Sequence, residues 1–198
     1  ANPACERATP SLLMTPDTAE GTVPNLKFSY AQARNRVRSG GWAREITTRE
    51  LPVATEMAGV NMRLTPGGIR EMHWHQFGEW AYVTDGICRI TTIDNTGAAN
   101  VEDVSKGGLW YFPSGLPHSL QGVGDDGCEF IICFDEGRAS EYTTLLVTDW
   151  FAHTPPDVLA MNFGVPAETF KNIPLEDLYI FQGALPGPIE PDQRSAQA

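Results

Sequence analysis

The sequence predicts an all-β domain, a β-sandwich or β-barrel, because short runs of β-branched and aromatic residues recur between turn residues about every ten positions. Residues 94–97, Asp-Asn-Thr-Gly, are a turn signal between two such runs. The chain has 198 residues, which is enough for one domain with a sizeable core. The expected strands are 60–64, 79–83, 88–93, 109–112, 130–134 and 143–148.

The last quarter of the chain has a different character, because prolines and glycines there delimit two stretches that predict short helices. Residues 158–163 follow two prolines and precede a glycine, which is typical of a helix. A second short helix is expected over 166–172. We therefore expect an N-terminal extension (1–24), a barrel (25–150), a helical excursion that packs on the barrel or on a partner (151–183), and a linker or tail (184–198).

The chain is acidic, with a formal net charge of −11 and a pI of about 4.7. Neither nucleic acid nor a membrane is therefore expected as a partner. No apolar run reaches the length of about eighteen residues that a membrane-spanning helix needs. No signal peptide is visible, and the sequence leaves a cytoplasmic or a secreted location open.

The four cysteines, Cys5, Cys88, Cys128 and Cys133, contain no CxxC pair, which argues against a thiolate zinc site. Cys88 and Cys133 lie in apolar, strand-like runs, where we expect buried and inert thiols. Cys5 lies in a polar N-terminal segment that does not indicate a role for it.

Three of the four histidines, together with Glu79, fall in two glycine-bounded segments. His73 and His75 are two positions apart, so on a strand both imidazoles point to the same face. Glu79 has the same parity and joins them if the strand continues or bulges slightly. His118 comes from a second strand, after a turn shaped by two prolines and a glycine. We expect these four side chains to hold one metal ion inside the barrel.

Three imidazoles and one carboxylate form a mixed nitrogen and oxygen site that suits Mn, Fe, Co, Ni, Cu or Zn rather than Ca. On an octahedral ion, four protein ligands leave two positions open for substrate or dioxygen. The spacing of the ligands does not rank these metals. His153 has no such partner pattern, and we interpret it as structural or exposed.

The two segments resemble the two sequence motifs of the cupin family. The resemblance implies a cupin jelly-roll β-barrel with short flanking helices. One departure is Gly122, which stands where the second motif usually has asparagine, at a position that is not a ligand. The matching positions are Gly67-x5-His73-x-His75-x3-Glu79-x6-Gly86 and Gly107-x5-Pro113-x-Gly115-x2-His118.

Over residues 20–187 the chain further resembles the N-terminal half of the bicupin oxalate decarboxylases, in segments such as IREMHWH and TDWFAHTPPDVLAMNFGV. Members of that family use manganese and split oxalate into formate and carbon dioxide, with dioxygen as a catalytic co-substrate. The resemblance therefore implies Mn(2+) as the metal, oxalate as the substrate and dioxygen as the co-substrate of a carboxy-lyase.

The resemblance also implies two catalytic residues. Arg70 matches the family's substrate-binding arginine, although its parity differs from that of His73, so it must lie across a bend. Glu141 matches the proton-transferring glutamate of a mobile lid. This chain reads Ser-Glu-Tyr-Thr-Thr over residues 140–144 where the family pattern is Ser-Glu-Asn-Ser-Thr, and the bulkier Tyr142 would slow lid closure or change its poise. From the residues alone, Arg70 would be a solvated strand arginine and Glu141 a surface carboxylate.

The resembled enzymes have two cupin domains, whereas this chain provides one. We expect either a second cupin domain as a partner, with this chain as one half of a cleaved or truncated bicupin, or a homo-oligomer, a trimer or hexamer. The alternative functions are an oxalate oxidase and a manganese-binding or storage cupin without catalysis.

Overall fold

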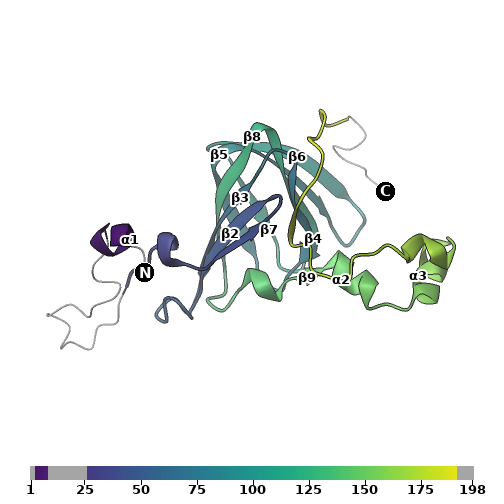
Figure 1. Cartoon of the computed structure of the whole chain (residues 1–198), viewed down its shortest axis with the longest axis horizontal. Helices are drawn as coiled ribbons and strands as arrows, with labels where there is room; N and C mark the ends of the chain where they lie inside the picture. The colour runs from purple at the N-terminus through teal and green to yellow at the C-terminus, as the bar shows by residue number, and fades with distance from the viewer. Residues whose placement is uncertain (1–2, 9–25, 191–198) are drawn as a thin grey trace.

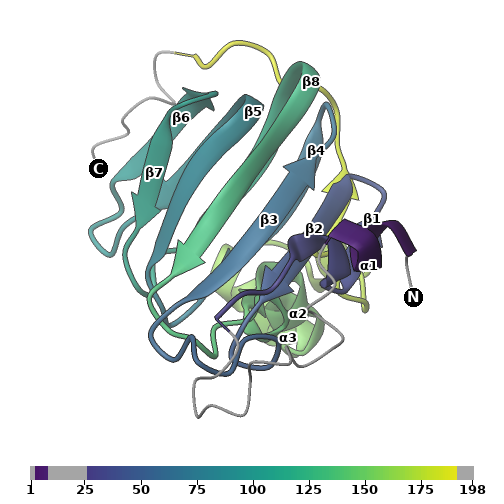
Figure 2. The same cartoon turned by 90° about the vertical axis from the view of Figure 1, so that its left-hand side faces the viewer.

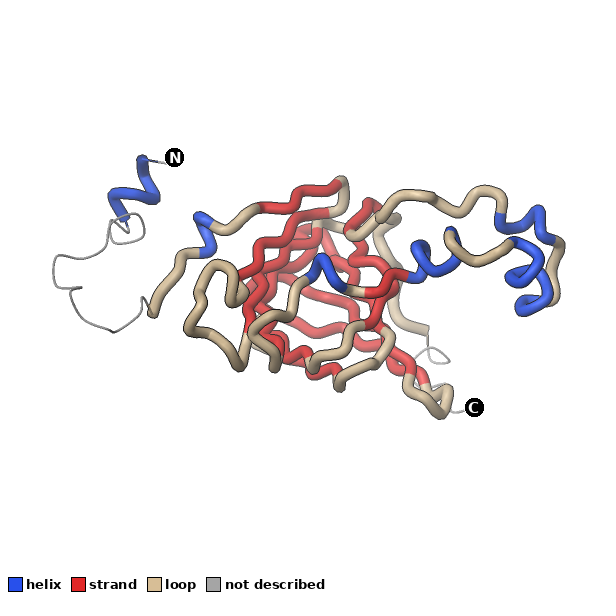
Figure 3. The backbone as a smooth tube through the Cα atoms, turned by 90° about the horizontal axis from the view of Figure 1, so that it is seen from below, coloured by secondary structure: helices blue, strands red, loops and turns tan. Residues whose placement is uncertain are grey.

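A curled β-sheet forms the body of the molecule; the helices over residues 147–163 project from one side of it, and the N-terminal helix lies on the opposite side (Figures 1 and 3). The computed structural model describes residues 3–8 and 26–190. None of the helices in those two stretches is long and apolar enough to cross a membrane. The strands are β1 (Asn35–Arg38), β2 (Gly41–Ile46), β3 (Ala58–Leu64), β4 (Gly68–Trp74), β5 (Glu79–Ile93), β6 (Ala99–Ser105), β7 (Leu109–Phe112), β8 (His118–Phe134), β9 (Leu145–Leu146) and β10 (Ile180–Gln182). The helical elements are α1 (Pro3–Ala8), η2 (Tyr30–Gln32), η3 (Glu141–Thr143), α2 (Val147–Ala152), α3 (Pro156–Phe163) and η4 (Ala167–Phe170).

Strands β5 and β8 are long enough to take part in both halves of the barrel. Residues 79–86 of β5 pair with residues 128–134 of β8, and residues 87–92 of β5 pair with residues 118–123 of β8. One half has the strand order β1-β2-β3-β8-β5-β7, and the other has the order β10-β4-β8-β5-β6. The two long strands thus join both halves into one curled sheet (Figure 2). The fold predicted from the sequence, a cupin jelly-roll barrel with short flanking helices, is confirmed.

Glycines mark the point where both long strands pass from one half to the other. The β5–β8 ladder skips residues 124–127, and Gly86, Gly124 and Gly127 have φ angles of 71°, 69° and 67°. Only glycine adopts this left-handed conformation without strain. A Cβ atom at Gly127 would also lie 2.2 Å from the carbonyl oxygen of Leu64. These positions therefore allow the sharp bend that closes the barrel.

The barrel interior is filled by apolar side chains from alternating positions of its strands. Val60, Met62 and Leu64 alternate on β3 and are fully buried, as are Phe130 and Ile132 on β8. The interior also contains charged and polar side chains, which are rarely buried unless they are paired or bind a ligand. These side chains are Glu45, Arg70, Glu71, His73, His75, Glu79, His118 and Glu141.

Five of the six predicted strands are confirmed, and those at 79–83 and 88–93 belong to one long strand, β5. The strand predicted over 143–148 is wrong. Within that range only Leu145–Leu146 is a strand, with a 3-10 turn before it and the start of α2 after it. The reason is local, because the Ser140 side chain caps the 3-10 turn by accepting a hydrogen bond from the Tyr142 N–H at 3.2 Å.

The helical excursion follows the sequence prediction in its first part. Helix α3 begins at Pro156 and ends at Gly164, a left-handed C-cap with φ 66°. The second predicted helix, over 166–172, is a 3-10 turn of Ala167–Phe170. Helix α2 contacts the barrel where the rings of Trp150 and Trp74 pack edge to face, at 5.7 Å between centroids. The chain then returns to the barrel, because β10 pairs with β4.

The described part of the predicted tail, residues 184–190, runs along the barrel. Gln121 Nε2 donates to the carbonyl oxygen of Ala184 at 3.1 Å, and Arg89 Nη1 donates to that of Gly187 at 2.8 Å. The predicted domain boundaries remain predictions, and residues 1–2, 9–25 and 191–198 lie outside the described part of the chain.

Candidate metal centre

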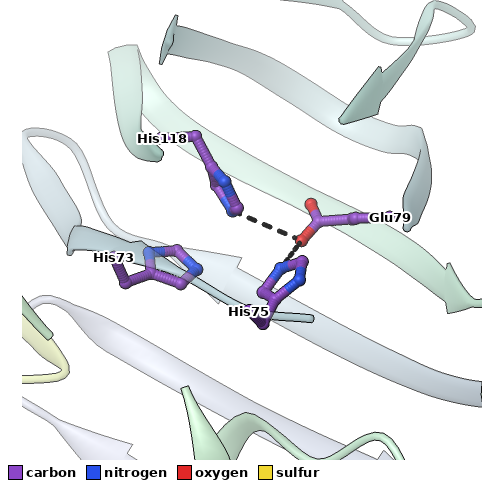
Figure 4. A group of neighbouring side chains, drawn as sticks. All are labelled: His73, His75, Glu79 and His118. Carbon is purple, nitrogen blue, oxygen red and sulfur yellow. Dashed lines mark hydrogen bonds and ion pairs between the residues drawn. The ribbon is translucent and has the colours of Figure 1, made fainter. Parts of the chain in front are cut away.

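Four predicted ligands meet inside the barrel (Figure 4). His73 lies on β4, His75 directly follows that strand, Glu79 begins β5, and His118 begins β8. All four are buried, and one potential ligand atom of each lies within 4.8 Å of those of the others. The structure thus brings together the four residues that the spacing singled out.

Each of the three imidazoles is oriented by a hydrogen bond to the backbone. In every case the ring Nδ1 lies within hydrogen-bond distance of a carbonyl oxygen two residues away, and a carbonyl only accepts. Nδ1 must therefore carry the proton, which leaves the Nε2 lone pair free to bind a metal ion. The pairs are His73 with Glu71 O (2.6 Å), His75 with Phe77 O (2.7 Å) and His118 with Leu116 O (2.8 Å).

Glu79 completes the set and is itself oriented. Trp110 Nε1 donates to Glu79 Oε1 at 3.1 Å, so that Oε2 faces His75 Nε2 at 3.3 Å and His118 Nε2 at 3.5 Å. Among the described residues, His118 Nε2 is a buried polar atom without a hydrogen-bond partner. Imidazole nitrogens and a carboxylate that converge on one point are stabilised by a cation between them, either a shared proton or a metal ion. The four residues therefore fit a divalent metal ion.

The electrostatics of these groups also favour a cation. Burial alone would raise the pKa of Glu79, but its contacts with His118 and His75 outweigh burial and lower that pKa. Burial would lower the pKa of His75, but the hydrogen bond and charge of Glu79 outweigh it and raise that pKa. Burial, and next the positive charge of Arg70, lower the pKa of His73 well below its ordinary value. Glu79 therefore stays ionised and His73 stays neutral, the forms that bind metal.

Glu79 lies on a different strand from His73, whereas one strand was expected to run from the histidines to Glu79. The strand does not continue from His75 to Glu79; the chain turns at residues 76–78, and Glu79 begins the next strand. The second motif stabilises this turn, because Gly115 N–H donates to the His75 carbonyl oxygen at 2.8 Å. Gly115 has φ 78°, a conformation that suits glycine. The two motifs therefore contact each other through the backbone as well as through their ligands.

Arg70 has the opposite parity to His73, and an irregularity of the strand lies between the two residues, as expected. The β4–β8 register shifts between Arg70 and His73, and both Arg70 and Glu71 are buried although they are neighbours on the strand. This β-bulge turns the Arg70 side chain into the interior, where none of its surface is exposed. Its Nη1 has no hydrogen-bond partner within the described residues. The arginine is therefore buried with one donor available.

Glu141 lies in the segment of residues 140–144, here called the lid, and it contacts Arg70. Arg70 Nε and Nη2 lie 3.0 and 2.9 Å from Glu141 Oε2, and the Tyr179 hydroxyl donates to the same oxygen at 3.1 Å. Arg70 Nη2 also donates to Thr144 Oγ1 at 3.1 Å. Glu141 is only 3% exposed, so its side chain lies in the interior beside Arg70.

The lid is also held from the barrel wall by Glu45, a residue that the sequence reasoning missed. The Glu45 carboxylate accepts hydrogen bonds from the Ser140 hydroxyl at 2.9 Å and from the Glu141 N–H at 2.9 Å. Burial raises the pKa of Glu45, and these hydrogen bonds only partly offset the effect. A signal was present in the sequence, because Glu45 has the inward parity of Gly41 and Ala43 on β2.

Two further residues were missed, Trp110 and Tyr179. Trp110 is one of the two buried residues of an alternating strand, and its indole N–H requires a partner, which is a usable signal. Tyr179 has no comparable signal, because its backbone has φ 53° and its contacts come from distant parts of the chain.

The remaining predicted residues lie away from the centre. His153 is exposed at the end of α2, with its Nδ1 2.7 Å from the Asp149 carbonyl oxygen. Cys88 is buried as expected, whereas Cys133 is only half-buried, which corrects the prediction. Burial raises the pKa of both thiols. The side chain of Cys5 lies outside the described part of the structure.

Comparison with known proteins places this architecture among metal-dependent relatives. The sequence matches the cupin family over residues 28–171. It is 50% identical over 187 residues to oxalate decarboxylase OxdC of Bacillus subtilis, an alignment that covers 94% of this chain and 48% of the relative. The chain thus spans about half the length of that curated relative.

Two solved structures extend the comparison. One comes from work on the Mn(II) centres of B. subtilis oxalate decarboxylase; it has a TM-score of 0.85 and 49% identity, covering 95% of this chain and 50% of that one. The other is Lactobacillus farciminis oxalate decarboxylase in a formate complex; it has a TM-score of 0.82 and 48% identity, covering 85% of this chain and 49% of that one. With the fold, the motif residues and these similarities in agreement, the chain belongs to the cupin family.

Proposed function

We propose that this chain is the catalytic cupin domain of a manganese-dependent oxalate decarboxylase, a carboxy-lyase that uses dioxygen as a catalytic co-substrate. The reaction consumes one proton: oxalate and a proton give formate and carbon dioxide. The bond between the two carbons breaks, and the carbon that remains receives the proton, with no net oxidation. The observation that supports this proposal most is a buried glutamate, Glu141, hydrogen-bonded to a buried arginine close to a site of three histidines and one carboxylate.

The ligands that we propose for manganese are His73, His75, Glu79 and His118. Their donor set of three nitrogens and one oxygen suits a divalent transition metal. The Mn(II) centres of the B. subtilis relative support manganese among those metals. An ion held there would supply one-electron redox chemistry and a Lewis acid for an anionic substrate.

Arg70 is the residue that we propose for binding oxalate. Its guanidinium is fully buried and keeps Nη1 without a partner among the described residues. A guanidinium presents several donors in one plane, which suits a small dicarboxylate. Its charge would also attract oxalate locally into a protein whose net charge of −11 would otherwise repel an anion.

Glu141 is the residue that we propose for proton transfer. A carboxylate can take a proton from the substrate and later return it to carbon, provided that it lies within reach of the reacting atoms. The closed lid keeps Glu141 almost fully buried, and Arg70 and Tyr179 fix its Oε2 atom. Burial also excludes water, which would compete as a proton source or allow oxidation to proceed instead.

The natural assembly is a separate proposal. Because the chain spans about half of its relatives, we propose that it associates either with a second cupin domain or with copies of itself, as a trimer or hexamer. Exposed apolar side chains on helices α2 and α3, including Trp150, Met161 and Phe163, are consistent with such a contact. Size-exclusion mass combined with intact-mass spectrometry would distinguish the two assemblies.

A product assay tests the proposed function. Metal-analysed protein is incubated with carbon-labelled oxalate and air, and formate, carbon dioxide and peroxide are quantified. The proposal expects formate and carbon dioxide in equal amounts, with little peroxide. Peroxide with two carbon dioxide molecules per oxalate would show an oxalate oxidase instead. Neither formate nor peroxide, from protein that contains manganese, would indicate a manganese-binding or storage cupin.

A further inference from the structure

The lid also contacts the outside of the barrel, away from the buried cluster around Glu141. Tyr142 is 44% exposed, and its ring centroid lies 4.7 Å from the guanidinium carbon of Arg36 on β1. A guanidinium within about 6 Å of an aromatic ring is attracted by the electron density of the ring face. The lid is therefore held at a second point, outside the buried cluster.

Arg36 is itself fixed by the barrel side of this contact. It forms an ion pair with Asp177, and its guanidinium carbon lies 3.7 Å from the centroid of the Tyr179 ring. Only 12% of the Arg36 side chain is exposed. Arg36 thus contacts Tyr142 of the lid and Tyr179 of the barrel, and two of its contacts, those with Asp177 and Tyr179, do not involve the lid.

The barrel tyrosine connects this outer contact to the buried one. The hydroxyl of Tyr179 donates to Glu141 Oε2 at 3.1 Å, while its ring contacts Arg36. The contacts therefore run from Tyr142 through Arg36 and Tyr179 to the carboxylate of Glu141. An asparagine at position 142, as in the family pattern, would offer no ring to Arg36, so the outer contact depends on a residue in which this chain departs from that pattern.

We propose that Arg36 and Tyr142 form a latch that stabilises the closed lid, which makes Arg36 a positioning residue for Glu141. The latch does not contact the four proposed metal ligands, so breaking it leaves metal binding intact. It raises the fraction of time for which Glu141 is buried beside Arg70. A lid that opens more often would lower the ratio of formate to peroxide, and this catalytic consequence rests on the proposed function. The effect of the latch on how often the lid opens does not depend on the proposed function.

Amide hydrogen exchange tests the latch without any measurement of activity. The reporter is the lid, in particular the Glu141 N–H, which donates to Glu45 only when the lid is closed. Tyr142→Leu should speed exchange in the lid about two- to five-fold, the effect of losing one exposed cation–π contact. Arg36→Met should speed it by at least as much, because it also loses the contacts with Tyr179 and Asp177. Tyr142→Phe keeps the ring and should exchange at the wild-type rate. The double variant should exchange no faster than the faster single variant, because both changes remove the same contact.

Exchange in β5 and β8 serves as the internal control for global stability. Unchanged lid exchange in Tyr142→Leu, an equal effect of Tyr142→Phe, or additive effects in the double variant would each overturn the latch. The ratio of formate to peroxide should fall by a similar factor in Tyr142→Leu. Wild-type protein that forms no formate would reject the proposed function, while the exchange data would still decide the latch.

Discussion

The metal centre and the lid are stabilised in different ways. The ligands of the centre lie on or beside strands that are paired along their length, and each imidazole is fixed by a backbone carbonyl. The lid is a single 3-10 turn held by side chains: Glu45 at its start, Arg70 and Tyr179 at Glu141, and Arg36 at Tyr142. The centre is thus part of the sheet, whereas the lid is attached to the sheet mainly by side-chain contacts.

This difference separates the two properties that the proposed activity needs. A cage built from paired strands keeps its geometry through many turnovers, which suits an ion that must stay bound. A segment held by a few polar contacts can open for substrate and close again, at a free-energy cost that single substitutions can change. Changes at the centre should therefore alter metal content, and changes at the lid should alter products while metal content stays constant.

The largest expected effect comes from removing a ligand. His118→Ala should reduce manganese from about one ion per chain to near zero and abolish turnover, because it removes one of four ligands at a fully buried site. His153→Ala removes the exposed histidine outside the centre and is the matched control. Elemental analysis after loading and desalting measures both. Full manganese occupancy in His118→Ala would contradict the proposed cage.

The next effect should appear at the lid without loss of metal. In Glu141→Gln the amide oxygen can still accept hydrogen bonds from Arg70 and Tyr179, but the side chain can no longer carry a proton. Formate production should fall about a hundredfold or more, with a larger share of peroxide. Glu102→Gln, at an exposed position on β6, controls for the loss of one negative charge. Formate at the wild-type rate from Glu141→Gln would remove this residue from the proposed chemistry.

A smaller effect is expected from the residue that orients the carboxylate ligand. Trp110→Phe keeps an aromatic ring against Phe130 but loses the donor to Glu79 Oε1. Losing such an orienting partner weakens metal affinity about 10- to 100-fold. Competition with a metal-binding dye measures the affinity, and Trp80→Phe on the outer face of β5 is the control. Equal affinities for both variants would show that the sheet alone orients Glu79.

The smallest effect concerns pH and the support of the lid. Because burial raises the pKa of Glu45 in the folded protein, this group favours the fold most below its unfolded pKa of about 4.3, and that contribution is lost as the pH rises through the folded pKa. Glu45→Gln cannot ionise, so its stability relative to wild type should increase as the pH rises from 4 to 7.

Urea denaturation of metal-free protein across this pH range measures the effect, and Glu56→Gln, which replaces an exposed carboxylate, is the charge control. A stability difference between Glu45→Gln and wild type that stays constant, or that runs the other way with pH, would show that Glu45 is not strained by burial.

The sequence predicted the metal centre better than the lid, for a physical reason. Strand parity and two motifs with fixed spacing were sufficient to bring His73, His75 and His118 together. The position of Glu79 was right, although the chain turns before it instead of continuing as a strand. The lid depends on contacts between distant segments, such as the pair of Arg36 and Asp177, which are 141 positions apart and follow no local pattern.

Arg70 and Glu45, which both contact the lid, differ in how well strand alternation predicts their burial. Arg70 has the wrong parity for the interior, and only the β-bulge between it and His73 turns it inward. Glu45 has inward parity on β2, and a carboxylate at such a position is a signal that reasoning from the sequence can use. The alternation of inward and outward side chains therefore predicts which residues are buried where the strand pairing is regular. It fails where a β-bulge shifts the register.

The central claim is that one manganese ion binds to four atoms: the Nε2 atoms of His73, His75 and His118 and one carboxylate oxygen of Glu79. Anomalous diffraction at the manganese absorption edge, from crystals of metal-loaded protein, tests this claim directly. The account predicts one strong peak at the centre of these four atoms, at bonding distance from each. A peak bound elsewhere, or no peak in protein that is fully loaded with manganese, would contradict it.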